Sequence, residues 1–108
     1  MVTADKDEAV FKALASNDRR KILDFLYSCP LTTGEICQQL PWLSRCAVMQ
    51  HLKVLTKAGL TINKKQGRNN WHYLDINPIQ GIYQRWLKPY AAPAANFLFD
   101  LKENIENE

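Results

Sequence analysis

The residues best suited to do chemistry in this 108-residue chain follow Ser44, where cations, an amide and a thiol recur at helical spacing. At intervals of four, three and four residues, these are Cys46, Gln50, Lys53 and Lys57. Such a pattern puts them on one side of a helix. Amide and cationic groups on one helix face can bond to base edges and phosphates in a DNA major groove. A solvated lysine face on an ordinary amphipathic helix is the alternative.

The same stretch carries the signals of the helix that must hold these groups. Val48, Leu52 and Leu55 recur at intervals of four and three on the opposite side, where they would meet a core. Ser44 is a suitable N-cap, and Gly59 can take the left-handed conformation that ends a helix. The sequence therefore predicts an amphipathic helix from Ser44 to Ala58.

A shorter helix is expected just before it. Thr32 and Glu35 have the spacing of a capping box, and the helix that they open covers residues 34–40. Residues 41–43, Pro-Trp-Leu, then form a tight turn. A short helix, a tight turn and a longer amphipathic helix make a helix-turn-helix.

After Gly59 the pattern changes from helical to alternating. Residues 60–64 and 71–74 alternate apolar and polar side chains and predict two strands. Between them, residues 65–70 form a basic loop in which Gly67 can take a positive φ. We interpret this two-stranded ribbon as a wing.

Helices are also expected on both sides of this core. Residues 7–15 and 18–27 have apolar side chains at helical spacing, with Ser16 as the second N-cap and Cys29-Pro30 as the stop. Leu31 is expected to be a short extended link. A last helical region starts with Asn77 as cap and Pro78 at the first position, and Pro89 and Pro93 should kink or divide it.

Composition limits the class of protein. With 46% hydrophobic and 23% charged residues, residues 1–108 should form one globular domain that is mainly α with a small β-wing. A net charge of +3 permits a nucleic-acid partner without demanding one. No membrane span or signal peptide is evident, and three cysteines without a C-x-x-C pair suit the reducing cytoplasm. No catalytic or phosphate-binding motif is present, so we expect neither an enzyme nor a cofactor.

With these parts in order, the chain resembles winged helix-turn-helix repressors of the ArsR family. The matching stretches are ALASNDRRKILDFL (13–26), TTGEICQQL (32–40), LSRCAVMQHLKVLTKAGL (43–60) and KKQGRNNWHYLD (64–75), and the HLKVL-x-x-AGL run is the most specific. The resemblance implies a homodimer that binds operator DNA and represses transcription, often until a metal or another signal releases it.

The chain departs from the metal-sensing members of that family. They carry E-L-C-V-C-D at the positions of residues 35–40, so Cys37 matches but the second thiolate position is Gln39. No histidine follows His72, which stands where the family usually has tyrosine, and Asn17 replaces a common proline. Three or four convergent ligands are needed for a transition metal, so no metal is expected. Cys37 is then expected to be a small buried side chain, with a relic of a metal site as the alternative.

Individual roles follow from the positions. We expect DNA contacts in the helix and the wing from Ser44, Arg45, Cys46, Ala47, Met49, Gln50, His51, Lys53, Lys64, Lys65, Arg68 and Asn69. For His51 a structural role is an equal alternative, and for the wing cations simple solubility is one. Trp71, His72 and Tyr73 are expected to pack rather than to stack on bases. Arg19 is expected to form an ion pair on a helix surface.

The chain ends carry more apolar side chains than a small core can cover. A two-fold dimer is therefore expected through the terminal helices, residues 5–15 and 78–106. Its interface residues would be Val10, Phe11, Leu14, Trp86, Tyr90, Phe97, Leu98 and Leu101. The alternative is that the last helix folds back on its own subunit.

Three other functions remain open at this level. The winged helix could serve protein–protein interaction without any DNA role, which the modest net charge and Trp42 would suit. Oxidation of Cys46 on the DNA-facing side could make the protein a redox sensor. An unidentified small inducer could bind between the terminal helices of the dimer.

Overall fold

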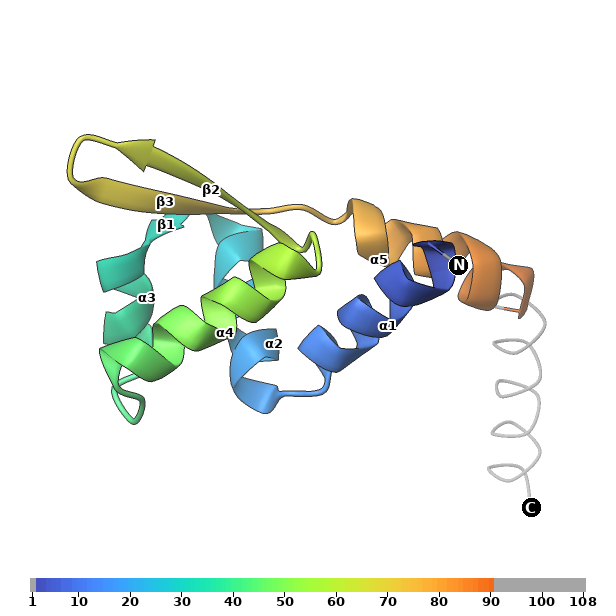
Figure 1. Ribbon diagram of the computed structural model, residues 1–108, viewed down its shortest axis with the longest axis horizontal. Coiled ribbons are helices and arrows are strands. Elements are labelled where there is room, and N and C mark those ends of the chain that lie inside the picture. The colour runs from blue at the N-terminus through green and yellow to red at the C-terminus, as the bar shows by residue number, and fades with distance from the viewer. Residues whose placement is uncertain (1, 91–108) are drawn as a thin grey trace, which may run out of the picture. The chain divides into compact units, whose positions relative to one another are not determined.

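The computed structural model describes residues 2–90, which belong to two compact units. The first unit ends at Pro78 and the second begins at Ile79. The first unit holds four helices and three strands in the order α1, α2, β1, α3, α4, β2, β3 (Figure 1). This mainly helical architecture with a small antiparallel sheet confirms the predicted fold class.

The first two helices, α1 (Val2–Leu14) and α2 (Asn17–Ser28), meet at the predicted cap. The Ser16 side chain accepts a hydrogen bond from the backbone N–H of Arg19. Ile22, Leu23 and Leu26 then face the core, as their spacing predicts. The predicted start of α1 at residue 7 is too late, because residues 2–6 also take helical conformation.

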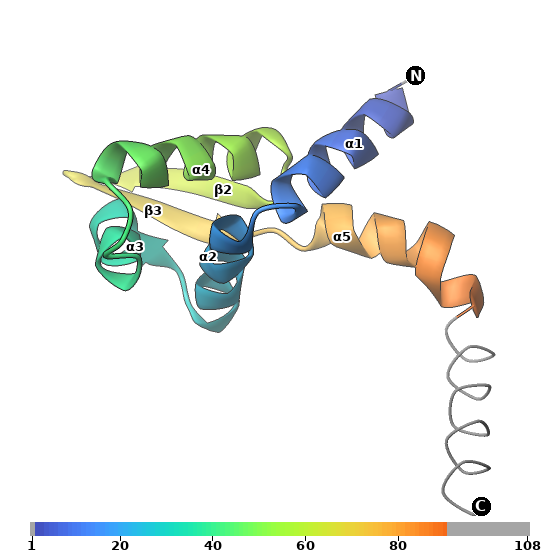
Figure 2. The same cartoon turned by 90° about the horizontal axis from the view of Figure 1, so that it is seen from below.

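The helix-turn-helix is formed by α3 (Thr33–Gln39) and α4 (Arg45–Lys57). Thr32 and Glu35 make the complete capping box, with each side chain bonded to the other residue's backbone N–H. Gly59 has φ +79°, so the chain leaves α4 through the left-handed conformation that glycine allows. Both α3 and α4 lie below the sheet in Figure 1, and Figure 2 shows the short loop that runs from α3 into α4.

The sheet has one strand more than predicted. Its order is β1 (Leu31–Thr32), β3 (Asn69–Leu74), β2 (Thr61–Gln66), and both pairings are antiparallel. The extended link at Leu31 is confirmed, but it also pairs with His72 as an edge strand. This contact joins residues 41 positions apart in the sequence, which local periodicity does not reveal.

The wing strands are longer than predicted and the turn is shorter. Pairing continues from Thr61↔Leu74 to Gln66↔Asn69, so Lys65 and Asn69 belong to strands rather than to a loop. Gly67 has φ +61° and allows a two-residue turn, which keeps the strands paired to the tip. The tip lies clear of the helices (Figure 1).

One apolar core holds the first unit together. Its best-buried members come from every helix of the unit and from the start of the wing: Val10, Ala13, Ile22, Leu26, Ile36, Leu40, Val48, Leu52, Leu55 and Leu60. Trp42 in the turn between α3 and α4 is bound to α2, with its indole N–H 3.0 Å from Asp18 Oδ1 and the Lys21 ammonium 4.6 Å from the ring centre.

The last described segment is α5 (Asn77–Ile82), followed by a π-helical turn, η1 (Tyr83–Leu87). Asn77 is the first helical residue rather than the predicted cap, and the Asp75 carboxylate accepts its N–H at 3.0 Å. The N–H of Lys88 bonds to the carbonyl of Tyr83, five residues back. Pro89 follows and has no N–H to donate, so the widened turn lies where proline was expected to disturb the helix. Pro93 lies outside the described residues.

None of the helices between residues 2 and 90 combines the length and hydropathy needed to cross a membrane.

Candidate nucleic-acid interface

The outward face of α4 carries the side chains that the sequence singles out. Ser44 Oγ accepts the Ala47 N–H at 3.1 Å and begins the helix. Val48, Leu52 and Leu55 are buried, and this burial turns the other side of the helix to solvent. The exposed candidates on that side are Arg45, Cys46, Met49, Gln50 and Lys53, and Ala47 is half-buried. The two-sided helix is therefore confirmed, while DNA contact by these residues stays a prediction.

The wing adds a second set of exposed polar groups. Lys64, Lys65 and Arg68 are exposed, and so is Asn69. Their strands have no buried side chain between Ile62 and Trp71, so this part of the hairpin does not pack into the core. All four predicted wing residues are thus accessible.

Charge is distributed unevenly along the chain. Residues 36–74 contain six of the 14 Lys and Arg residues and none of the 11 Asp and Glu residues. The six cations lie on α4 and the wing, and all are exposed: Arg45, Lys53, Lys57, Lys64, Lys65 and Arg68. The net charge of +3 is therefore the sum of a strongly cationic region, residues 36–74, and a net negative remainder of the chain. A region of this kind attracts polyanions.

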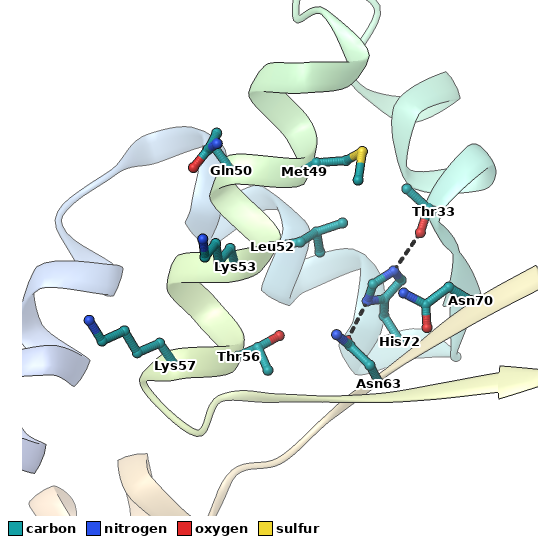
Figure 3. A pocket seen from close by; sticks show the side chains of 10 residues that line it. All are labelled: Thr33, Met49, Gln50, Leu52, Lys53, Thr56, Lys57, Asn63, Asn70 and His72. Atoms are coloured by element: carbon teal, nitrogen blue, oxygen red, sulfur yellow. Dashed lines mark hydrogen bonds between the residues drawn. The ribbon is translucent and has the colours of Figure 1, made fainter.

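A groove of about 500 Å³ lies between α4 and the sheet (Figure 3). Met49, Gln50, Lys53 and Lys57 line it from α4, and Asn63 and Asn70 from the wing strands. Thr33, Leu52, Thr56 and His72 complete the lining. The groove brings Met49, Gln50 and Lys53 beside the wing strands, but none of the four predicted wing residues lines it.

The lining also identifies residues absent from the predicted set. Lys57 is one, although its spacing from Lys53 already placed it on the cationic side. Asn63 and Asn70 are the others on the wing, and no sequence signal distinguishes them from the remaining polar strand residues. Their inclusion depends on the register of β2 against β3.

His51 has a structural partner. Its Nδ1 lies 3.2 Å from Arg19 Nη1, and because a guanidinium only donates, this nitrogen accepts. Arg19 Nε and Nη2 donate to the carbonyls of Ala13 at 2.8 Å and Lys12 at 3.0 Å. In place of the predicted ion pair, the Arg19 guanidinium bonds to helix-end carbonyls and an imidazole. Half-buried and bonded to Arg19, His51 has the structural role that was left open.

His72 is the one fully buried residue of β3, with 2% of its surface exposed. Its Nε2 lies 2.7 Å from Thr33 Oγ1 and its Nδ1 2.8 Å from Asn63 Oδ1. Burial lowers the pKa of the imidazole, because removal from water disfavours its charged form. The packing prediction is confirmed for His72, and Trp71 and Tyr73 beside it are half-buried.

The three cysteines are free thiols. Cys46 and Cys29 are exposed, and Cys37 is half-buried rather than fully buried as expected. Within the described part of the chain, no three His, Cys, Asp or Glu side chains gather closely enough to hold a metal ion.

The residues proposed for a dimer interface differ in exposure. Phe11 is 53% exposed, Trp86 61% and Tyr90 67%, whereas Leu14 is half-buried. Val10 is only 2% exposed, so it belongs to the core of its own chain and has little surface to offer a partner. Phe97, Leu98 and Leu101 lie outside the described residues, as does most of the predicted interface segment 78–106.

Comparison with known proteins adds independent information. Residues 14–63 match a family described as a helix-turn-helix domain. The chain is 40% identical over 75 residues to the HTH-type transcriptional regulator Rv2034 of Mycobacterium tuberculosis, covering 69% of each protein. It is 31% identical over 71 residues to the transcriptional repressor SdpR of Bacillus subtilis, covering 66% of this chain and 78% of that one.

Among solved structures, an ArsR-like transcriptional regulator from Rhodococcus sp. RHA1 is similar, with a TM-score of 0.72 and 26% identity. The match covers 98% of this chain and 95% of that one. The winged helix-turn-helix architecture predicted from the sequence is therefore shared with a regulator over nearly its whole length.

Proposed function

The chain belongs to the ArsR family of winged helix-turn-helix transcriptional regulators, and we propose that it represses transcription as a homodimer bound to operator DNA. The observation that carries the proposal is the acid-free cationic surface of α4 and the wing, with six exposed Lys and Arg side chains, of which Lys53 and Lys57 line the groove. Members of this family are DNA-binding regulators and not enzymes.

Different side chains on this surface have different tasks. Gln50 can make a bidentate contact to the N6 and N7 atoms of adenine, which reads sequence in the major groove. Arg45 and Lys53 on the same face can reach phosphates or guanine. Lys64, Lys65 and Arg68 on the wing would bind the backbone or the flanking minor groove, where contacts add affinity with little sequence selectivity.

Two-fold symmetry would let two copies of α4 read a palindrome. Large aromatic side chains on α1 and near the end of the described chain support a dimer, because Phe11, Trp86 and Tyr90 are each more than half exposed. Adjacent major grooves on one face of a duplex are about 34 Å apart, and the two recognition helices must match that spacing. Repression rather than activation is proposed from similarity to a repressor.

We place this function in the cytoplasm, where reducing conditions keep thiols such as Cys29, Cys37 and Cys46 free.

The decisive experiment measures binding to duplexes that the protein selects from a random pool. The double variant Gln50→Ala/Lys53→Ala should bind the selected palindrome about a hundredfold more weakly, because each subunit loses a base contact and a phosphate contact. The slope of log affinity against log salt should fall by roughly one unit per subunit. The same titration would detect a small inducer as a loss of affinity.

A matched control removes a comparable pair of side chains elsewhere. Gln38→Ala/Arg20→Ala removes one exposed amide from α3 and one exposed cation from α2. It should leave affinity and salt slope unchanged, and sedimentation should give the same mass for both double variants. Equal affinities of the parent and the Gln50→Ala/Lys53→Ala variant would refute the proposal that this surface binds DNA. A monomer at micromolar concentration would refute the proposal of a homodimer.

A further inference from the structure

The wing leaves the body of the protein at His72. Beyond this residue toward the tip, β3 has no fully buried side chain, and β2 has none after Thr61. The third strand, β1, pairs only with His72 and Trp71. From Asn70 to the tip, the hairpin therefore has neither a third strand nor an apolar anchor, and its direction is set where it leaves the core.

His72 at this point joins three segments of the chain. Thr33 is the first residue of α3, and Asn63 is the cross-strand partner of His72 on β2. The Asn63 carbonyl oxygen accepts, so Nδ1 of the neutral ring carries the proton and Nε2 accepts the Thr33 hydroxyl. Figure 3 shows the imidazole between these two side chains, at the end of the groove lined by Met49 and Leu52 of α4.

Hydrogen bonds of this kind constrain direction as well as distance. An apolar side chain at residue 72 could pack in several orientations, whereas two bonds of 2.7 and 2.8 Å to opposite edges of one ring hold the ring in a single one. Because His72 belongs to β3, fixing its ring also fixes the direction in which the next residues of β3 leave the core. Thr33 and His72 are 9% and 2% exposed, so neither is available for contact with DNA.

We propose that His72 is a positioning residue for DNA binding, which with Thr33 and Asn63 holds the wing at the angle that lets its cations and α4 meet one duplex. The proposal rests on the proposed function and extends it. Loss of either bond should reduce the contribution of the wing to binding and leave the contribution of α4 intact. Two of the three residues, Thr33 and His72, are buried and do not touch the ligand.

A double-mutant cycle tests this coupling, with the palindrome selected by the parent protein as probe. Thr33→Val keeps the shape of the side chain and removes the bond to Nε2. Arg68→Ala removes a cation from the wing tip, and Lys53→Ala removes one from α4. Each should weaken binding about fivefold, equivalent to one hydrogen bond or phosphate contact. The double variant Thr33→Val/Arg68→Ala should also bind about fivefold more weakly than the parent, because a displaced wing has no contact left to lose.

Two further variants separate positioning from general destabilisation. Thr61→Val removes a comparable buried hydroxyl from the first residue of β2, where it is bonded at 2.9 Å to Thr56. The loss of affinity caused by Arg68→Ala should be the same with or without Thr61→Val. Thr61→Val should lower the urea midpoint by about as much as Thr33→Val does. Asn63→Ala removes the Nδ1 partner from an exposed strand position and should repeat the coupling if Thr33→Val folds poorly.

The outcomes are distinguishable. If the double variant Thr33→Val/Arg68→Ala binds roughly twenty-five-fold more weakly, the two losses of affinity multiply. That result would overturn the positioning role, because the effects of independent sites add in free energy. Equal coupling of Thr33→Val to Lys53→Ala and to Arg68→Ala would also overturn it, since the defect would then be global. If Arg68→Ala has no effect, the wing does not bind and the inference falls while α4 binding stands. If Lys53→Ala also has none, the proposed function itself fails.

Discussion

Arg19 offers a sharp test of how this small fold is held together. Its guanidinium joins the end of α1 to the middle of α4, through the carbonyls of Ala13 and Lys12 and through His51. Replacing it by methionine keeps the aliphatic part of the side chain and removes all three bonds. Replacing it by lysine leaves a single ammonium, which lacks the planar fork that serves three acceptors in different directions.

The magnitude follows from the surroundings of each bond. The Ala13 and His51 bonds are partly buried, and each should contribute about 1 kcal/mol, near the mean for hydrogen bonds in proteins. The Lys12 carbonyl is exposed, so water can replace its partner and the loss there is a few tenths of a kcal/mol at most. Arg19→Met should therefore lower the free energy of unfolding by about 2–3 kcal/mol, and Arg19→Lys by about 1–2 kcal/mol.

Urea unfolding at a fixed protein concentration measures these values, since a dimer would make the midpoint depend on concentration. The neighbouring Arg20 is the control, because its Nη1 donates to the Leu14 carbonyl at an exposed position. Arg20→Ala should cost less than about 1 kcal/mol. A decrease for Arg19→Met no larger than that for Arg20→Ala would refute the claim that Arg19 joins the two helices.

Two more predictions concern the wing and its anchor. Because burial lowers the pKa of His72 in the folded chain, the unfolded chain binds a proton more readily as pH falls below about 6.5, and the stability held above that pH is progressively lost. Urea titrations between pH 7.5 and 5 should show a slope, relative to His72→Gln, of at most about 1.4 kcal/mol per pH unit, and parallel curves for the two proteins would contradict it. Gly67→Ala should destabilise the protein by about 1 kcal/mol, because φ is +61° there, although the added methyl has open space. Gly34→Ala, inside α3 and equally open, should instead stabilise it by about 0.5–1 kcal/mol, and equal effects of the two substitutions in thermal unfolding would show that backbone conformation is not the cause.

Several features of this protein were readable from the sequence because each depends on neighbours along the chain. The caps at Ser16 and Ser44, the capping box at Thr32 and the glycine that ends α4 are all governed by residues three or four positions away. The two faces of α4 follow from the helical period in the same way. With the family resemblance, these local signals were enough to place the helix-turn-helix, the wing and the cationic candidates.

What remained undetermined involved contacts between distant segments. Leu31 pairs with His72 across 41 residues, Thr33 bonds to His72 across 39, and Arg19 reaches His51 across 32. Periodicity shows which side of an element turns inward, but it does not show which side chain of another element will meet it there. The outward face of α4 was therefore determined by its own residues, whereas the anchoring of the wing and the role of Arg19 were decided only when the helices and the sheet packed together.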